Sequence, residues 1–347
     1  MDILQLTSRK RETYHVQLTY SLLWESALGI AAITNSKLLQ TLERPEKYWD
    51  EIKNSITDEL LDHLKFVEQN NTWKSLLQIL HQREFADLSE FTTYVNTIDE
   101  TELRFICLPF IGNDYQIYRE KAAQGERSSV EKMVQATADN PFFPTYIEFM
   151  TKCDIRFLKE HLIHVMRGWY KEVLERDGTE ISTILKNDYE AKKQMREKLA
   201  PEELVQWATG GVTYTPEPSV HQVLLIPQYI YRPWNIEADI ERTKVFYYPV
   251  SNESITPYDK YTPNNFLVLK HKALGDEVRL RIVKLLSEEN RTLQDLTDQL
   301  NIGKSTIHHH LKILRAAKLV EILHAKYGLK KDAIQLLCKE LEVYLEK

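Results

Sequence analysis

The chain has 347 residues, 43% of them hydrophobic, which is enough for two or three domains with sizeable cores. Aromatic residues make up 10%, and this proportion excludes extensive disorder. Its three cysteines, Cys107, Cys153 and Cys338, lie far apart and exclude a locally encoded disulfide framework or Cys-rich metal site. We expect a soluble, cytoplasmic protein without membrane contact, because no signal-like or membrane-spanning apolar segment is present.

The net charge of −6 is unevenly distributed along the chain. Residues 266–347 contain 15 Lys and Arg against 11 Asp and Glu, a net charge of +4, so the 265 preceding residues carry −10. We therefore expect the two parts to face different partners.

The first part is predicted to be mostly helical with a small sheet. A period-two alternation at 14–18 indicates a strand, after which apolar residues recur three or four positions apart over long stretches up to residue 199. Runs of β-branched and aromatic residues near 222–232 and 244–249 then predict paired strands.

A segment rich in Ser, Asn, Thr and Pro, residues 251–264, is predicted to be a linker. It divides the chain into an N-terminal regulatory domain, residues 1–250, and a C-terminal domain, residues 265–347. The expected fold class is mainly α with small β elements, with a winged helix-turn-helix as the C-terminal domain.

Two helices of the C-terminal domain each begin at a local capping signal. Asp276 is placed to cap one helix, and Thr292, with Asp295 three residues later, forms a capping box for the next. A tight turn at 301–303 follows, in which we expect Gly303 to supply a backbone without a Cβ penalty.

A third helix, residues 304–317, and a short hairpin complete the motif. The hairpin strands are predicted at 320–323 and 326–329, joined by a tight turn at His324 and Ala325, and a terminal helix follows.

The third helix has the sequence expected of a DNA-recognition helix. Ile307, Leu311 and Leu314 form its buried side, which turns a thin polar face outward. Residues 301–320 contain four basic residues and no acidic one, which suits phosphate neutralisation beside a major groove. The predicted DNA-contacting residues are Thr292, Lys304, Ser305, Thr306, His308, His309, Lys312, Arg315 and Lys326.

Two segments of this region resemble a known family. Residues 272–282, KALGDEVRLRI, and 305–314, STIHHHLKIL, occur in the order and at the separation typical of ArsR-type (arsenic-repressor-like) winged-helix regulators. Residues 224–234 and 247–249 also resemble larger ArsR-type proteins with an additional N-terminal domain of unassigned role. The resemblance implies a homodimer on double-stranded DNA, with half-sites about 34 to 36 Å apart.

An apolar stripe on the last predicted helix supplies a candidate dimer interface. Its predicted interface residues are Ile334, Leu337, Leu341 and Leu345. Pairing of such stripes across a two-fold axis would bury them, and packing within their own domain is the alternative. Cys338 lies in the same stripe and is interpreted as a small hydrophobe rather than a redox switch.

Histidines form two groups that invite a metal interpretation, and no metal or other cofactor is predicted at either. His308, His309 and His310 are adjacent on a helix and point about 100° apart. The paired-Cys box of the family's metal sensors is missing from 295–300. His161 and His164 are three apart, but without further ligands we interpret them as a partly exposed helix face, with one His packed against Trp169.

Aromatic residues around Arg232 leave two interpretations open: a ligand-binding cleft for a small-molecule effector, or ordinary core packing. The residues concerned are Tyr229, Tyr231, Arg232, Trp234, Tyr247 and Tyr248. Nucleophile elbows, Walker loops and Gly-rich dinucleotide fingerprints are absent, so no enzyme is predicted.

The sequence therefore predicts a sequence-specific, double-stranded DNA-binding transcriptional regulator. We expect a dimeric repressor whose N-terminal domain modulates DNA binding. The alternative is a winged-helix protein-interaction module with a ligand-binding N-terminal domain and no DNA role. A third interpretation, an enzyme fused to a regulator, would require a bound metal or cofactor.

Overall fold

The structure, a computed structural model, describes residues 13–259, 261–323, 325–335 and 337–345. Helices dominate and strands are few, which confirms the expected fold class. The chain forms two compact units: an N-terminal unit, Met1–Lys193 with Pro216–Pro249, and a C-terminal unit, Gln194–Thr215 with Val250–Lys347. Within the described ranges no helix is long and apolar enough to cross a membrane.

A four-stranded mixed sheet organises the N-terminal unit. Its strands are β1 (His15–Leu18), β2 (Gln222–Gln228), β3 (Ile236–Ile240) and β4 (Thr243–Pro249), in the order β1-β2-β4-β3. The strands β1, β2 and β4 are parallel, and β3 is antiparallel to β4. Strands β2 and β4 are buried along almost their whole length, as expected for parallel strands covered by helices.

Strand β3 was not predicted, although its sequence carries a signal. Its apolar and charged residues alternate, as in a strand with one solvated face at a sheet edge. Across the pair with β4, the Lys244 Nζ lies 3.1 Å from a Glu237 carboxylate oxygen and 3.2 Å from an Asp239 carboxylate oxygen. These ion pairs hold the edge strand in register.

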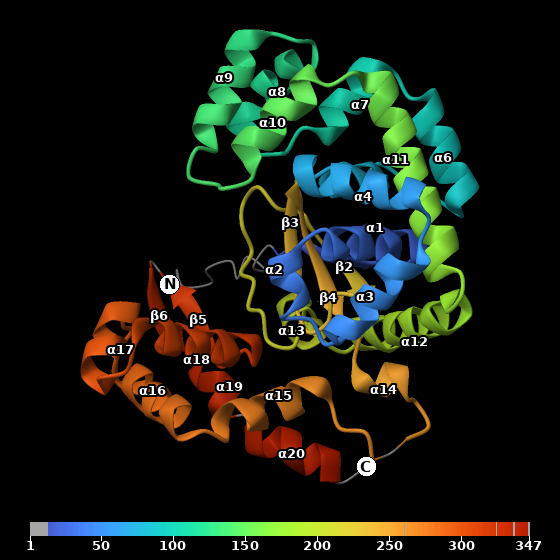
Figure 1. Ribbon diagram of the computed structural model, residues 1–347. Coiled ribbons are helices and arrows are strands. Elements are labelled where there is room, and N and C mark those ends of the chain that lie inside the picture. The colour runs from blue at the N-terminus through green and yellow to red at the C-terminus, as the bar shows by residue number, and fades with distance from the viewer. Residues whose placement is uncertain (1–12, 260, 324, 336, 346–347) are drawn as a thin grey trace, which may run out of the picture. The chain divides into compact units, whose positions relative to one another are not determined.

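The helices of the N-terminal unit surround α1, of whose residues all but Leu22 are buried. A Cβ on Gly29 would lie only 2.7 Å from the Trp169 indole, so the glycine permits the close approach of these two segments. Figure 1 shows α7, α8, α9 and α10 gathered at one end of the unit. The helices are α1 (Leu22–Ile33), α2 (Ser36–Leu39), α3 (Glu46–Ser55), α4 (Asp58–Asn70), α5 (Trp73–Leu80), α6 (Leu88–Thr97), α7 (Glu100–Cys107), α8 (Gln116–Ala123), α9 (Arg127–Ala136), α10 (Phe143–Lys152), α11 (Ile155–Trp169) and α12 (Gly178–Arg196), with a 3₁₀ turn η1 (Asn113–Tyr115) and a π-helical segment η2 (Tyr170–Leu174).

The C-terminal unit is helical apart from one hairpin. Its helices are α13 (Pro201–Ala208), α14 (Asn252–Ile255), α15 (Asn265–Leu274), α16 (Glu277–Glu288), α17 (Leu293–Leu300), α18 (Lys304–Ala316), α19 (Lys331–Gln335) and α20 (Leu337–Leu345), and its strands are β5 (Val320–Leu323) and β6 (Lys326–Leu329).

One segment of the chain, residues 194–215, falls outside the unit in which it was expected. Residues 194–215 pack with the C-terminal unit: Gly210 lies against the ring of Phe266, and the Lys330 ammonium donates a hydrogen bond to the Gly211 carbonyl. These contacts join residues more than 50 positions apart, which no local pattern announces.

The expected linker, 251–264, is partly structured. It contains α14, and the Asn252 amide donates a 2.8 Å hydrogen bond to the Pro263 carbonyl. Lys260 lies outside the described residues.

Candidate nucleic-acid interface

Three helices and a hairpin form a small core of their own in the C-terminal unit. Ile282 of α16, Leu296 of α17 and Leu314 of α18 are fully buried there. Ile307 and Leu311 are buried on the same side of α18, so the predicted inward face of the third helix is confirmed.

Both predicted caps of this motif are confirmed. The Asp276 side chain accepts a 3.0 Å hydrogen bond from the Arg279 backbone N–H at the start of α16. At the start of α17 the Thr292 hydroxyl accepts from the Asp295 N–H at 3.2 Å, and the Asp295 carboxylate accepts from the Thr292 N–H at 2.8 Å. These bonds satisfy N–H groups that have no partner within the helix, so they fix where each helix begins.

The turn between α17 and α18 uses a different residue from the one expected. Asn301 occupies the left-handed region, with φ 52° and ψ 45°, and ends α17. Gly303 has an ordinary φ of −55° and lies at the N-cap of α18. Asn tolerates the left-handed conformation better than other residues with a Cβ, so it turns the chain here without glycine.

The predicted recognition residues lie together on the outer face of α18. The exposed residues of this set are Lys304, Ser305, Thr306, His308, His309, Lys312 and Arg315. Ser305 and Thr306 occupy the first turn, where free backbone N–H groups and the helix dipole favour a negatively charged partner.

The three adjacent histidines diverge, as the helical geometry predicted. His308 and His309 are exposed, whereas His310 is half-buried with its Nδ1 3.8 Å from an Asp276 carboxylate oxygen. Burial lowers the pKa of His310 below its ordinary value. His310 therefore packs inside the motif and joins α18 to the start of α16.

The hairpin after α18 forms the expected wing. Strands β5 and β6 are antiparallel, and Ala325, in the turn, has a left-handed φ of 64°. Lys326 is exposed, and so are the apolar side chains of Ile322 and Leu323. His324, predicted in the turn, lies outside the described residues.

A bridge outside the two wing strands was missed at the sequence level. The Arg291 and Tyr327 backbones exchange two hydrogen bonds, at 3.0 and 2.7 Å, just before Thr292 begins α17. Thr292 itself is half-buried and its hydroxyl oxygen is engaged in the capping box. The bridge ties the wing to the helix-turn-helix and has no local sequence signal, because its partners are 36 positions apart.

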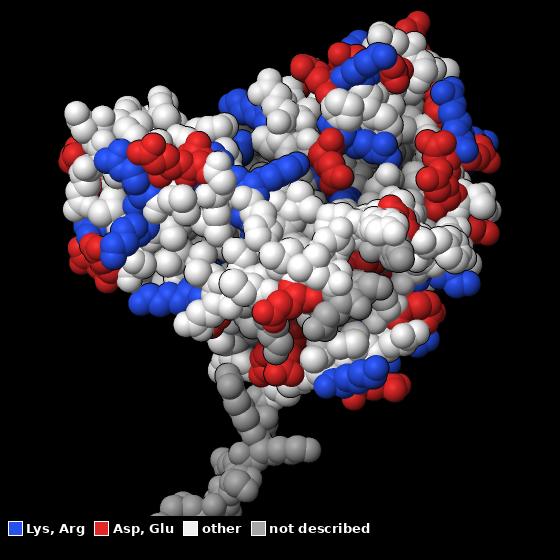
Figure 2. All heavy atoms as spheres, turned by 90° about the horizontal axis from the view of Figure 1, so that it is seen from below, with Lys and Arg blue, Asp and Glu red and all other residues white. Residues whose placement is uncertain are grey.

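The excess of positive charge in this motif is confined to one short segment of the chain. On the face of the molecule shown in Figure 2, Lys and Arg side chains are interspersed with Asp and Glu. Against this mixed surface, the acid-free segment 301–320 concentrates one sign of charge on one helix. Positive side chains beside a helix N-terminus favour contacts with the negatively charged phosphates of DNA.

The apolar residues predicted to form the dimer interface are only partly exposed to solvent in the single chain. Ile334, Leu337 and Leu341 are half-buried, whereas Leu345 has 73% of its surface exposed. Helix α20 contacts α15 within the same unit, where the buried Lys270 ammonium bonds both Glu340 carboxylate oxygens at 2.6 and 2.8 Å.

Cys338 was expected to be a small hydrophobe within this stripe, and the structure shows it exposed. Glu340, two residues further on, lies about 200° around the helix from Cys338, and its carboxylate pairs with Lys270. The side of α20 opposite Cys338 therefore faces α15.

The aromatic residues around Arg232 pack in the core of the N-terminal unit and do not line an open cleft there. Arg232 is only 2% exposed, and its Nε lies 2.8 Å from a Glu43 carboxylate oxygen. Tyr247 and Tyr248 are fully buried, and the Tyr247 hydroxyl is 2.7 Å from His81 Nε2. Nearby, Trp24, His81 and other residues line a cavity of about 450 Å³.

The two histidines of α11 do not share one site. His161 is fully buried, and its ring contacts are to His63, Phe66 and Phe157 rather than to Trp169. His164 is exposed and pairs with Glu59 of α4, at 2.9 Å between Nδ1 and Oε1. The sequence reasoning missed Glu59 and His63, because they lie about a hundred positions before α11.

Comparison with known proteins gives the same assignment for the C-terminal motif. Residues 276–321 match the family model described as bacterial regulatory protein, arsR family. Over 49 residues, 14% of this chain, the sequence is 39% identical to the transcriptional repressor SdpR of Bacillus subtilis (strain 168). The aligned part spans about half of that relative, 54% of its length. No solved structure matches the chain. The C-terminal unit of this chain therefore carries an ArsR-type winged helix-turn-helix.

Proposed function

We propose that the protein is a sequence-specific, double-stranded DNA-binding transcriptional regulator that acts as a dimeric repressor. The observation that carries the proposal is the outer face of α18, where polar and basic side chains are exposed along an acid-free segment. An α-helix of this kind fits the major groove, and its N-terminal residues are the ones that reach base edges.

Each predicted contact residue, the half-buried Thr292 included, is assigned a role in this docking. Ser305, Thr306, His309 and Lys312 meet base edges or nearby phosphates from the groove. The remaining residues hold the sugar–phosphate backbone or the groove edge, and they are Thr292, Lys304, His308, Arg315 and, from the wing, Lys326.

The exposed end of α20 supports the dimer. Leu345 is largely exposed, and Leu337 and Leu341 retain partly accessible apolar surface on the same helix. Pairing with a second copy would remove this surface from water and place two α18 helices on one inverted repeat. The half-sites would then lie about 34 to 36 Å apart.

Modulation by the N-terminal unit is part of the proposal. Residues 1–265, most of which belong to this unit, carry a net charge of −10, which disfavours their binding to DNA phosphates. The cavity beside Trp24 and His81 has a volume suited to a small-molecule effector.

Selection of binding sites from random duplex DNA by the full-length protein, at fixed physiological salt, tests the central claim. We expect enrichment of an inverted repeat with half-sites about one helical turn apart. Absence of enrichment would favour the protein-interaction module instead, for which the exposed Ile322 and Leu323 of the wing offer apolar surface.

Lys312→Ala tests the docking of α18 on the selected site. Loss of one phosphate contact lowers the slope of log affinity against log salt by about 0.9 and weakens binding at physiological salt. Lys284→Ala, which removes an exposed lysine on α16 outside the acid-free segment, is the matched control and should change neither quantity. Equal behaviour of the two variants would show that α18 does not dock as described.

A further inference from the structure

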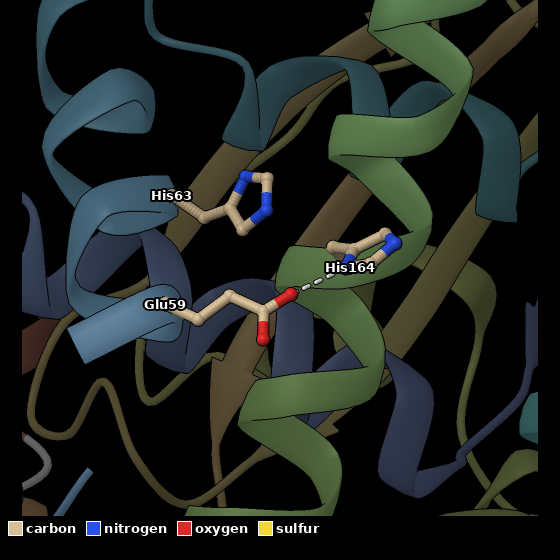
Figure 3. A group of neighbouring side chains, drawn as sticks. All are labelled: Glu59, His63 and His164. Carbon is tan, nitrogen blue, oxygen red and sulfur yellow. Dashed lines mark hydrogen bonds and ion pairs between the residues drawn. The ribbon is translucent and has the colours of Figure 1, made fainter. Parts of the chain in front are cut away.

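Three ligand-type side chains meet on the surface of the N-terminal unit. Glu59 and His63 lie four residues apart on one face of α4, and His164 extends from α11 (Figure 3). One ligand atom from each residue lies within 4.8 Å of the other two. The residues come from two helices that pack together in the core, so their proximity is built into the fold.

The donor set has the composition of a transition-metal site. Two imidazole nitrogens and one carboxylate oxygen suit zinc and related divalent ions, whereas calcium and magnesium prefer oxygen donors alone. Ligand bonds of about 2.0 to 2.1 Å place tetrahedral donors about 3.3 Å apart. Glu59 and His164 have exposed side chains, at 70% and 48%, and are free to rotate by the small amount needed.

A buried group fixes the orientation of His63. Its Nδ1 is 3.0 Å from the Nδ1 of His161, and the Nε2 of His161 is 2.8 Å from the Thr72 hydroxyl. His161 is fully buried, so its ring holds a fixed place behind His63. A hydrogen bond to one ring nitrogen, supported from behind, is how proteins orient a metal-binding histidine.

From this geometry we propose that Glu59, His63 and His164 bind a divalent metal ion with the ligand preference of zinc. His63 coordinates through Nε2, because its Nδ1 faces His161. His161 and Thr72 position that ring without touching the ion. The exposed side of the cluster leaves a fourth coordination position for water, as in open three-ligand zinc sites.

This site is separate from the winged helix. It lies entirely within the N-terminal unit and uses no residue of α17, α18 or the wing. The proposal does not depend on DNA binding, and each stands or falls by its own experiment.

The test uses the full-length protein after treatment with a chelator. Cobalt(II) titration followed by visible absorption reports coordination geometry, and zinc titration by calorimetry reports stoichiometry and affinity. We expect one tightly bound ion per chain, with a four-coordinate cobalt spectrum. Glu59→Gln, His63→Ala and His164→Ala should each weaken zinc binding at least about tenfold.

Two comparisons make the result decisive. Glu59→Gln keeps the shape of an exposed side chain, so its circular dichroism should match the parent and exclude misfolding as the cause of lost binding. The double variant His308→Ala/His309→Ala controls for the exposed histidines of α18 and should bind zinc normally. Zinc binding that is absent from the parent, or unchanged in all three cluster variants, would mean that the cluster is only a surface ion pair.

Discussion

The two units of this chain assemble their candidate sites in opposite ways. In the C-terminal unit the candidate DNA-binding residues fall within 35 positions, Thr292 to Lys326, and α17 begins at a local capping box. In the N-terminal unit, Glu59 and His164 meet across 105 positions of sequence. A local site can be inferred from spacing alone, whereas a site between packed helices requires knowledge of which helices pack.

Histidines show the same contrast. His308, His309 and His310 are neighbours in sequence, yet their exposures differ because adjacent positions on a helix diverge. His63, His161 and His164 are split between two helices, yet they lie close together. The ring centroid of His63 is 5.1 Å from that of His161 and 5.4 Å from that of His164. Adjacency in sequence is therefore a poor guide to a shared ligand site.

The largest expected effect tests the assignment of residues 194–215 to the C-terminal unit. Gly210 has a φ of +67°, and a Cβ there would overlap the Phe266 ring. Gly210→Ala combines backbone strain with overpacking, so it should lower the free energy of unfolding by about 2 to 5 kcal/mol. Hydrogen exchange of the full-length protein should show lost protection in α13 and α15.

Gly125→Ala is the matched control for this experiment. Gly125 also has a positive φ, +92°, but a Cβ would meet nothing within 4 Å. Strain alone should cost about 1 to 2 kcal/mol, with protection in α13 and α15 unchanged. Unaltered protection of α15 in Gly210→Ala would return 194–215 to the N-terminal part, as the sequence prediction had it.

The next effect concerns a buried carboxyl group in the N-terminal unit. Glu25 of α1 accepts hydrogen bonds from the Tyr229 and Ile230 backbone N–H groups, at 3.0 and 2.6 Å. Burial, opposed by these bonds, raises its pKa from 4.5 to about 7. Between these values the folded state holds more protons than the unfolded state, so the free energy of unfolding falls as pH rises from about 4.5 to about 7.

Glu25→Gln removes this titration. Urea unfolding followed by tryptophan fluorescence reports mainly on the N-terminal unit, which holds five of the six Trp residues. We expect the parent to lose on the order of a few kcal/mol more stability than the variant between pH 5 and pH 8. The same pH dependence in both proteins would show that Glu25 does not titrate in this range.

These residues also mark how far the sequence could predict the structure. The helical class, three of the sheet strands, the caps of α16 and α17 and the wing strands follow from periodicity and capping, which act over a few residues. The parallel pairing of β1 with β2 joins positions about 200 apart, and nothing local specifies it. Strand β3 and Asn301 did carry local signals. Apolar and charged residues alternate in β3, and Asn is a residue type that tolerates a positive φ. The prediction nevertheless placed no strand at 236–240 and assigned the turn to Gly303.

Candidate sites follow the same rule. The outward residues of α18 could be predicted because a buried stripe at helical spacing fixes the opposite face. Arg232 could not, because its burial depends on Glu43, which pairs with it from 189 positions away. The partners of His161 and His164 could not be predicted either, because His63 and Glu59 lie about a hundred positions away in the sequence.

The smallest effect tests the local side of the comparison, at the capping box of α17. Thr292→Ala removes the hydroxyl that accepts from the Asp295 N–H and should cost about 1 kcal/mol. Thr292→Ser keeps the hydroxyl and is the matched control. Amide exchange in the first turn of α17 should accelerate in the alanine variant alone, because its N–H groups lose their acceptor. If serine and alanine behaved alike, the start of α17 would be held by the Arg291–Tyr327 bridge next to it rather than by the local signal.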